Sequence, residues 1–116
     1  MQSLFHLPEP PRAADGGERF EPILSGSDGL LVERIISTGQ TTTPGHWYDQ
    51  EKDEWVCVLE GEAAILYENG REHHLTRGNT LFIPRRVRHR VTYTSSPCIW
   101  LAVHGFLREA SPPGSS

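Results

Sequence analysis

Short hydrophobic stretches alternate with turn-forming residues along most of the chain. Nowhere do apolar residues recur every three to four positions, as they do in an amphipathic helix. Short strand-like segments at regular spacing predict an all-β sandwich or barrel. The expected strands are residues 20–24, 30–37, 41–48, 55–59, 63–68, 71–75, 80–83, 88–94 and 98–106.

The two ends of the chain differ from this pattern. Residues 1–19 are rich in proline, glycine, alanine and charge, so we expect an irregular N-terminal arm. Residues 108–116 are polar and predict a disordered tail. The barrel is therefore expected to comprise residues 20–107. Within it, Asn69-Gly70 is the clearest hairpin turn, because both residues tolerate the positive φ angles of tight turns.

Alternation along the strands predicts which side chains share a face. Three sets are expected to point together: Glu54, Val56 and Val58; His89, Val91 and Tyr93; Trp100, Ala102 and His104. The first two sets place an ionisable residue at the start of a strand and apolar or aromatic residues deeper. An unpaired ionised glutamate in such a place is costly, so it requires a cation or a hydrogen-bond donor.

Composition limits the partners. The chain has 116 residues, the size of one domain, and a net charge of −4, which gives no general attraction to nucleic acid or an anionic membrane. The arginine-rich segment 84–90 is a weak nucleic-acid signal, because no aromatics interleave with it. It is either a surface that balances the acidic turn at 49–54 or a rim that attracts a substrate anion.

Nothing in the sequence predicts export or membrane insertion. No apolar run is long enough to span a bilayer, and residues 1–8 lack the features of a secretory signal. Two cysteines are too few for a disulfide scaffold. We therefore expect a cytoplasmic protein.

Two spacings carry a family resemblance. Glu54 is followed by six residues and Gly61; Gly78 is followed by five residues, Pro84, four residues and His89. These spacings resemble the two cupin motifs. The first motif is G-x5-H-x-H-x(3–4)-E-x6-G. The second motif is G-x5-P-x-G-x2-H-x3-N. The resemblance covers about residues 39–93 and implies a cupin double-stranded β-helix, a jelly-roll-like barrel. Similar single-domain cupins commonly form homodimers, and the arm could pair across such an interface.

The first motif departs from the family pattern between residues 46 and 54. His46 follows the first glycine by six residues instead of five, and Tyr48 stands where the second histidine belongs. Five residues then precede Glu54, one more than the pattern allows. Counting backward from Glu54 instead puts Asp49 or Gln50 in the second histidine position.

The resemblance implies a mononuclear metal centre held by His46, Glu54 and His89. Two histidines and one carboxylate leave open positions on a divalent ion, and such ligands do not distinguish Fe, Mn, Ni or Zn. Asp49, Gln50 or Tyr48 would be a further ligand. Tyr48 could instead be a proton donor or an orienting group, and His104 a second residue near the substrate.

Each of these residues also has a structural interpretation. His89 and His104 could be structural histidines, His46 a solvated loop residue, and Glu54 the partner of Arg85 or Arg88.

The resemblance and these alternatives leave three candidate functions. The first is a metal-dependent enzyme, an oxygenase, isomerase or lyase, acting on a small polar or carboxylate-bearing molecule. The second is a small-ligand sensor without catalysis, and the third a degenerate cupin without metal.

Overall fold

The computed structural model describes residues 2–110, so most of the tail expected at 108–116 lies outside the described residues. It contains a single 3-10 turn, η1 (Ser27–Gly29), and eight strands within that range. The strands are β1 (Arg19–Ser25), β2 (Leu31–Ser37), β3 (Asp53–Glu60), β4 (Glu62–Tyr67), β5 (Glu72–Thr76), β6 (Thr80–Ile83), β7 (His89–Thr94) and β8 (Cys98–Gly105). No helix within residues 2–110 is long and apolar enough to cross a membrane.

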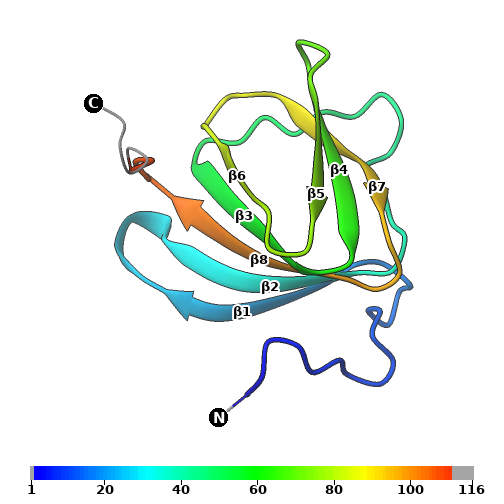
Figure 1. Cartoon of the computed structure of the whole chain (residues 1–116). Coiled ribbons are helices and arrows are strands. Elements are labelled where there is room, and N and C mark those ends of the chain that lie inside the picture. The colour runs from blue at the N-terminus through cyan, green and yellow to red at the C-terminus, as the bar shows by residue number, and fades with distance from the viewer. Residues whose placement is uncertain (1, 111–116) are drawn as a thin grey trace.

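The strands form two antiparallel sheets of unequal width, which face each other in Figure 1. The wide sheet has the order β1-β2-β8-β3-β6, and the narrow sheet has the order β5-β4-β7. This arrangement confirms the all-β prediction. The narrow sheet is formed by the predicted hairpin and its neighbour, with Gly70 at a φ of +92° in the turn between β4 and β5.

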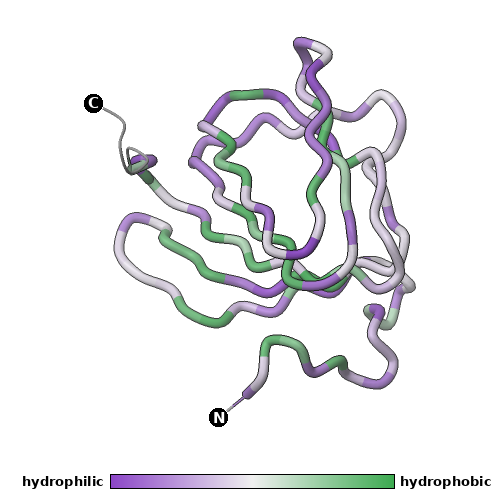
Figure 2. Tube along the Cα trace, in the orientation of Figure 1, coloured by the Kyte–Doolittle hydropathy of each residue, from purple (hydrophilic) through white to green (hydrophobic). Residues whose placement is uncertain are grey.

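The core lies between the two sheets, because one face of each central strand is apolar. On β3, Glu54, Val56 and Val58 are all buried, as the alternation predicts. The remaining core members come from both sheets: Ala63, Ile65, Leu75, Ile83, Cys98, Trp100 and Ala102. Hydrophobic segments follow these strands in Figure 2, whereas the hairpin tip between β4 and β5 is hydrophilic. Cys57 and Cys98 are free thiols.

The predicted strand at residues 41–48 is wrong. This segment forms only an isolated bridge between Tyr48 and His89, since Pro44-Gly45 turns the chain and Gly45 has a φ of +86°. The segment belongs to a long connection between β2 and β3 that lies along β7. Thr42 N donates to the Val91 carbonyl over 2.9 Å, and the Val91 amide donates to Thr42 Oγ1 over 2.9 Å. The connection thereby brings Tyr48 to the start of β7.

A bulge in β7 changes the predicted inward face of that strand. Ala64 of β4 pairs with Tyr93, and the next residue, Ile65, pairs with Val91. The extra residue reverses the alternation, so that Tyr93 is exposed and Thr94 is buried. Tyr93 therefore lies outside the barrel, contrary to the prediction that it shares a face with His89.

Two sets of contacts fix the ends of the barrel. In the arm, Arg34 Nη1 of β2 donates to the Leu4 carbonyl over 3.0 Å, so the arm lies against the outer strands. At the start of β3, the Asp53 carboxylate accepts hydrogen bonds from the Arg85 amide over 2.8 Å and the Leu107 amide over 2.9 Å. Asp53 thus ties the segments that follow β6 and β8 to the strand that carries Glu54.

Candidate functional site

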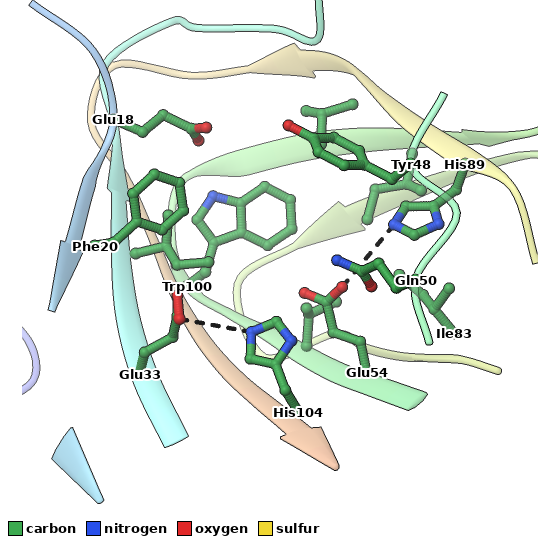
Figure 3. Close-up of a pocket in the computed structure, with 14 residues that line it drawn as sticks. Glu18, Phe20, Glu33, Tyr48, Gln50, Glu54, Ile83, His89, Trp100 and His104 are labelled. Carbon is green, nitrogen blue, oxygen red and sulfur yellow. Dashed lines mark ion pairs between the residues drawn. The ribbon is translucent and has the colours of Figure 1, made fainter. Parts of the chain in front are cut away.

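A pocket of about 160 Å³ opens inside the barrel, between the two sheets. Figure 3 shows its ionisable and aromatic side chains pointing toward a common centre. It is lined by Glu18, Phe20, Glu33, Ile35, Tyr48, Gln50, Glu54, Val56, Ile65, Ile83, His89, Val91, Trp100 and His104. Three carboxylates and two imidazoles therefore share a largely apolar pocket, and no Lys or Arg of residues 2–110 lines it.

Glu54 and His89 meet across the pocket from opposite sheets. Glu54 is the first inward residue of β3, His89 begins β7, and Glu54 Oε1 lies 3.9 Å from His89 Nε2. His89 Nδ1 lies 2.9 Å from the Val87 carbonyl oxygen, which fixes the proton on Nδ1. The lone pair of Nε2 is therefore free to accept a proton or a metal ion from the pocket.

Burial shifts the pKa of both groups toward their neutral forms. Burial, followed by the negative charge of Glu33, raises the pKa of Glu54 to about 7, and a hydrogen bond from Gln50 opposes the shift. Burial also lowers the pKa of His89, which the hydrogen bond to Val87 opposes. At neutral pH the pair therefore consists of a neutral imidazole and a partly protonated carboxyl group.

Glu54 has neither of the arginine partners considered for it. The Arg88 guanidinium instead forms an ion pair with Glu68, with 2.7 Å between Nη1 and Oε2. The Arg85 side chain lies over the Phe106 ring at 5.8 Å. The interpretation of Glu54 as the partner of either arginine is therefore wrong, and no arginine of segment 84–90 lines the pocket.

His104 also lines the pocket, where it lies beside a second carboxylate. It is paired in register with Glu54, from β8 to β3, and its Nε2 lies 3.6 Å from Glu33 Oε2. Burial lowers the pKa of His104; the charge of Glu33 opposes this shift and that of Lys52 reinforces it. The two carboxylate–imidazole pairs, Glu54 with His89 and Glu33 with His104, thus occupy one pocket.

The connection before β3 separates the remaining candidates. Tyr48 and Gln50 line the pocket, and Tyr48 is held there by paired backbone hydrogen bonds to His89 of 2.8 and 3.1 Å. His46 is exposed and contacts the outer side of the Tyr48 ring, with centroids 5.3 Å apart. Asp49 points away and pairs with Arg86 over 3.2 Å. The structure thus leaves His46 and Asp49 outside the pocket.

Four ionisable or aromatic pocket residues were not singled out from the sequence as functional: Glu18, Phe20, Glu33 and Trp100. Glu33 and Arg34 both interrupt the apolar residues of β2, and only the structure shows that Glu33 is the buried one. Glu18 lies in the segment expected to be irregular. It accepts a hydrogen bond from Ser37 Oγ, which in turn accepts the Trp100 indole N–H over 3.0 Å. This chain of hydrogen bonds orients both Glu18 and Trp100.

The donors of the pocket fit a divalent ion at one position. Two bonds of about 2.1 Å each can span at most about 4.2 Å, so an ion fits between Glu54 Oε1 and His89 Nε2, 3.9 Å apart. The hydrogen bond from His89 Nδ1 to a carbonyl is the support that metal-bound imidazoles usually have. In residues 2–110 no three His, Cys, Asp or Glu side chains form a metal cluster. The Gln50 amide, beside Glu54 in Figure 3, is the neighbouring neutral donor.

Fold and pocket together define a small β-barrel with an ionisable site inside it. A family model described as "Cupin domain" matches residues 32–104, which is more than half of the sequence. The chain therefore belongs to the cupin family, as the two motif spacings predict.

Solved structures agree with this assignment. A protein of Ralstonia eutropha JMP134, provisionally named a mannose-6-phosphate isomerase, is 39% identical with a TM-score of 0.81, over 92% of this chain and 98% of that one. A Thermus thermophilus protein is 23% identical with a TM-score of 0.69, over 90% and 95% of the two chains. A cupin superfamily protein of Desulfitobacterium hafniense DCB-2 is 13% identical with a TM-score of 0.68, over 83% and 84%. No curated protein matches the chain.

Proposed function

We propose that this protein binds a small polar molecule in the barrel pocket, next to a divalent ion held by Glu54 and His89. The observation that carries the proposal is the pair itself: two buried donors from opposite sheets, 3.9 Å apart. His89 Nε2 is free because Nδ1 is held by Val87. The Gln50 amide oxygen would be the third protein ligand in place of His46, and the remaining positions would be open to the ligand.

A bound divalent ion would supply Lewis-acid polarisation of a ligand oxygen. The chain's own residues support proton transfer beside it. His104 is neutral near pH 7, since burial lowers its pKa, and the Glu33 carboxylate 3.6 Å away would stabilise the imidazolium formed when His104 accepts a proton. Tyr48 lies at the pocket mouth, where its hydroxyl would orient the ligand. These roles suit an isomerase or a lyase.

The size and charge of the pocket limit the ligand. A volume of about 160 Å³ lies well below the roughly 300–1,000 Å³ of drug-sized sites. The Ralstonia eutropha protein is named for a phosphosugar. In this chain, three carboxylates and no Lys or Arg of the described residues line the pocket, which is unfavourable for a phosphate. Our proposal therefore does not extend a phosphosugar substrate to this chain.

A second candidate is a pocket that binds its ligand without metal. It is favoured by the lack of a third ionisable metal ligand within residues 2–110 and by the Glu54 pKa of about 7. A protonated Glu54 would then donate a hydrogen bond to the ligand, as a buried neutral carboxylic acid can.

Metal analysis distinguishes the two candidates. Protein purified without chelators and then dialysed against Mn²⁺, Fe²⁺, Ni²⁺ or Zn²⁺ is expected to retain one ion per chain. Glu54→Gln and His89→Ala are each expected to weaken retention at least about tenfold, because each removes one of two ionisable ligands. Glu51→Gln is the matched control, since Glu51 is a nearby exposed carboxylate that does not line the pocket. Equal retention by wild type and both pocket variants would eliminate the metal site and leave the second candidate.

A further inference from the structure

The pocket has two chemically different ends (Figure 3). One end contains His89, Gln50 and Tyr48, with the Glu54 carboxylate beside them. The other end contains Glu18, Phe20, Glu33 and Trp100. The proposed ion uses only the first end. The second end is formed by the residue just before β1, by β1 and β2 at one edge of the wide sheet (Figure 1), and by Trp100 of the central strand β8.

The second end is acidic and lacks a compensating protein cation. The Glu33 side chain is only 9% exposed and faces the pocket. Its nearest ionisable partner is the His104 imidazole at 3.6 Å, and no donor of residues 2–110 makes a hydrogen bond to its carboxylate. Glu18 accepts one hydrogen bond, from Ser37. The Glu18 and Glu33 carboxylates line a largely apolar pocket with few protein donors, where a hydrogen-bond donor or a positive charge stabilises an ionised carboxylate.

The same end presents aromatic surface. Trp100 is buried and its indole is held by Ser37, so its ring forms a fixed wall of the pocket. Phe20 of β1 lines the mouth and is 59% exposed. Indole and phenyl rings attract cations through their negative faces, and indole does so most strongly. Two carboxylates beside two aromatic rings form a site that favours positive charge by two independent interactions.

We infer that the Glu18–Glu33 end of the pocket binds a small organic cation, with an ammonium group between the two carboxylates and against Trp100 and Phe20. This inference names the ligand class of the proposed function and rests on that proposal only in using the same pocket. The volume of about 160 Å³ is close to that of an engineered protein cavity of about 150 Å³ that holds benzene. The ligand is therefore expected to be of about that size.

A set of probes that differ in charge tests the inference. Binding of n-butylammonium, butan-1-ol and butyrate is measured by calorimetry on the full chain, with and without the divalent ion. The ammonium is expected to bind at least about tenfold more tightly than the alcohol of the same chain length, a ratio typical of a buried charge-assisted hydrogen bond. Without the divalent ion, butyrate is expected to show no binding. Tetramethylammonium tests whether the site requires N–H donors or only positive charge.

Two variants and their controls locate the bound charge. Glu33→Gln keeps the side-chain shape and is expected to lower n-butylammonium affinity about tenfold or more. Phe20→Leu is expected to lower tetramethylammonium affinity about fivefold. The controls are Glu51→Gln and Phe106→Leu, because Phe106 is 60% exposed and does not line the pocket. Phe20→Leu changes an exposed side chain, so it remains informative even if Glu33→Gln fails to fold.

Several outcomes would overturn the inference. They are equal binding of ammonium and alcohol, tighter binding of butyrate, or cation binding that survives Glu33→Gln but disappears in Glu54→Gln. Metal retention is measured on the same samples and is expected to be unchanged in Phe20→Leu, because this variant removes no charge from the pocket. A protein that binds the cation but no metal would therefore refute the proposed ion and not the cation site. A protein that binds metal but not the cation would refute the cation site and not the proposed ion.

Discussion

Asp53 and Glu54 are adjacent residues whose carboxyl pKa values move in opposite directions. The amides of Arg85 and Leu107 donate to Asp53 and hold its pKa below the usual range, although its desolvation opposes this. Glu54 points to the other face of β3, where burial raises its pKa to about 7. The alternation of strand side chains thus puts one carboxylate among backbone donors and the next into an apolar pocket.

The raised pKa of Glu54 makes stability depend on pH. The folded state holds the Glu54 proton more tightly than the unfolded chain, whose carboxyl has the ordinary pKa of 4.5. This contribution is complete below pH 4.5 and is lost as the pH rises through about 7. In chelator, Glu54→Gln is expected to be more stable than wild type at pH 8, by up to about 3 kcal/mol. Urea unfolding at several pH values measures the difference.

The difference in stability between Glu54→Gln and the wild type is expected to depend on pH and on the divalent ion. The advantage of Glu54→Gln is expected to disappear near pH 4, where Glu54 of the wild type is protonated in both states. Adding a divalent ion at pH 8 is expected to stabilise the wild type and not the variant, because only the wild type offers the carboxylate. A wild type as stable as the variant at pH 8 in chelator would show that Glu54 is not desolvated as described.

The sequence indicated some pocket residues and not others, for physical reasons. Glu54 and His89 begin strands that are fixed by long-range pairing, so alternation alone predicted that they face inward. The connection between residues 38 and 52 is irregular, and its sequence carries no such period. A difference of a few residues there decides that Gln50 enters the pocket and His46 does not. Glu33 required knowledge of which face of β2 is covered.

At the scale of the elements, the turn-forming residues Asn69-Gly70 correctly predicted a hairpin. The predicted hairpin at Asn69-Gly70 is present, with the Tyr67 amide donating to the Arg71 carbonyl over 2.9 Å. The predicted strand at 41–48 failed because β-branched threonines favour extended chain, yet Pro44-Gly45 prevents regular pairing. The bulge in β7 had no signal in the sequence, since it arises from pairing with β4.

The turn between β3 and β4 is expected to depend on Gly61. This residue has a φ of +89°, and a Cβ there would lie 2.6 Å from the Pro97 carbonyl oxygen and 3.1 Å from Cys98 Cα. Both contacts are with backbone and cannot be relieved by a rotamer change. Gly61→Ala is therefore expected to cost about 3 kcal/mol or more in the free energy of unfolding, measured by chemical denaturation.

Gly70→Ala is the matched control for this prediction. Gly70 has a similar φ of +92°, but a Cβ there would meet nothing within 4 Å. Its substitution is expected to cost only the left-handed backbone strain, about 1 kcal/mol. Equal costs at the two glycines would mean that the close approach of the β7–β8 connection to Gly61 is not a constraint.

At the scale of the whole molecule, the unequal sheets leave apolar surface at one edge. Within residues 2–110, β1 pairs only with β2, and it exposes Phe20, Ile23 and Leu24. Exposed apolar side chains on an edge strand favour pairing with another copy. We expect a homodimer through β1, observable by sedimentation at micromolar concentration. Leu24→Lys, at a side chain 65% exposed, is expected to give a monomer of unchanged fold.

Sedimentation of the wild type at high concentration can contradict the expected dimer. A wild type that remains monomeric at high concentration would mean that the exposed side chains of β1 serve the pocket mouth alone. Phe106→Lys is the matched control, because Phe106 is 60% exposed but follows the central strand β8 and lies beside Arg85, away from β1. It is expected to leave the association state unchanged.

The position of β1 has a consequence for how ligand choice could change over time. The family match begins at residue 32, so Glu18 and Phe20 lie in a segment that precedes the matched barrel. Glu54 and His89, by contrast, lie within it, Glu54 on the wide sheet and His89 on the narrow sheet. Substitutions in the outer strand therefore alter recognition without disturbing the paired donors of the barrel. In this architecture, part of the recognition surface can change through Glu18 and Phe20 while Glu33 and Trp100, inside the matched range, stay in place.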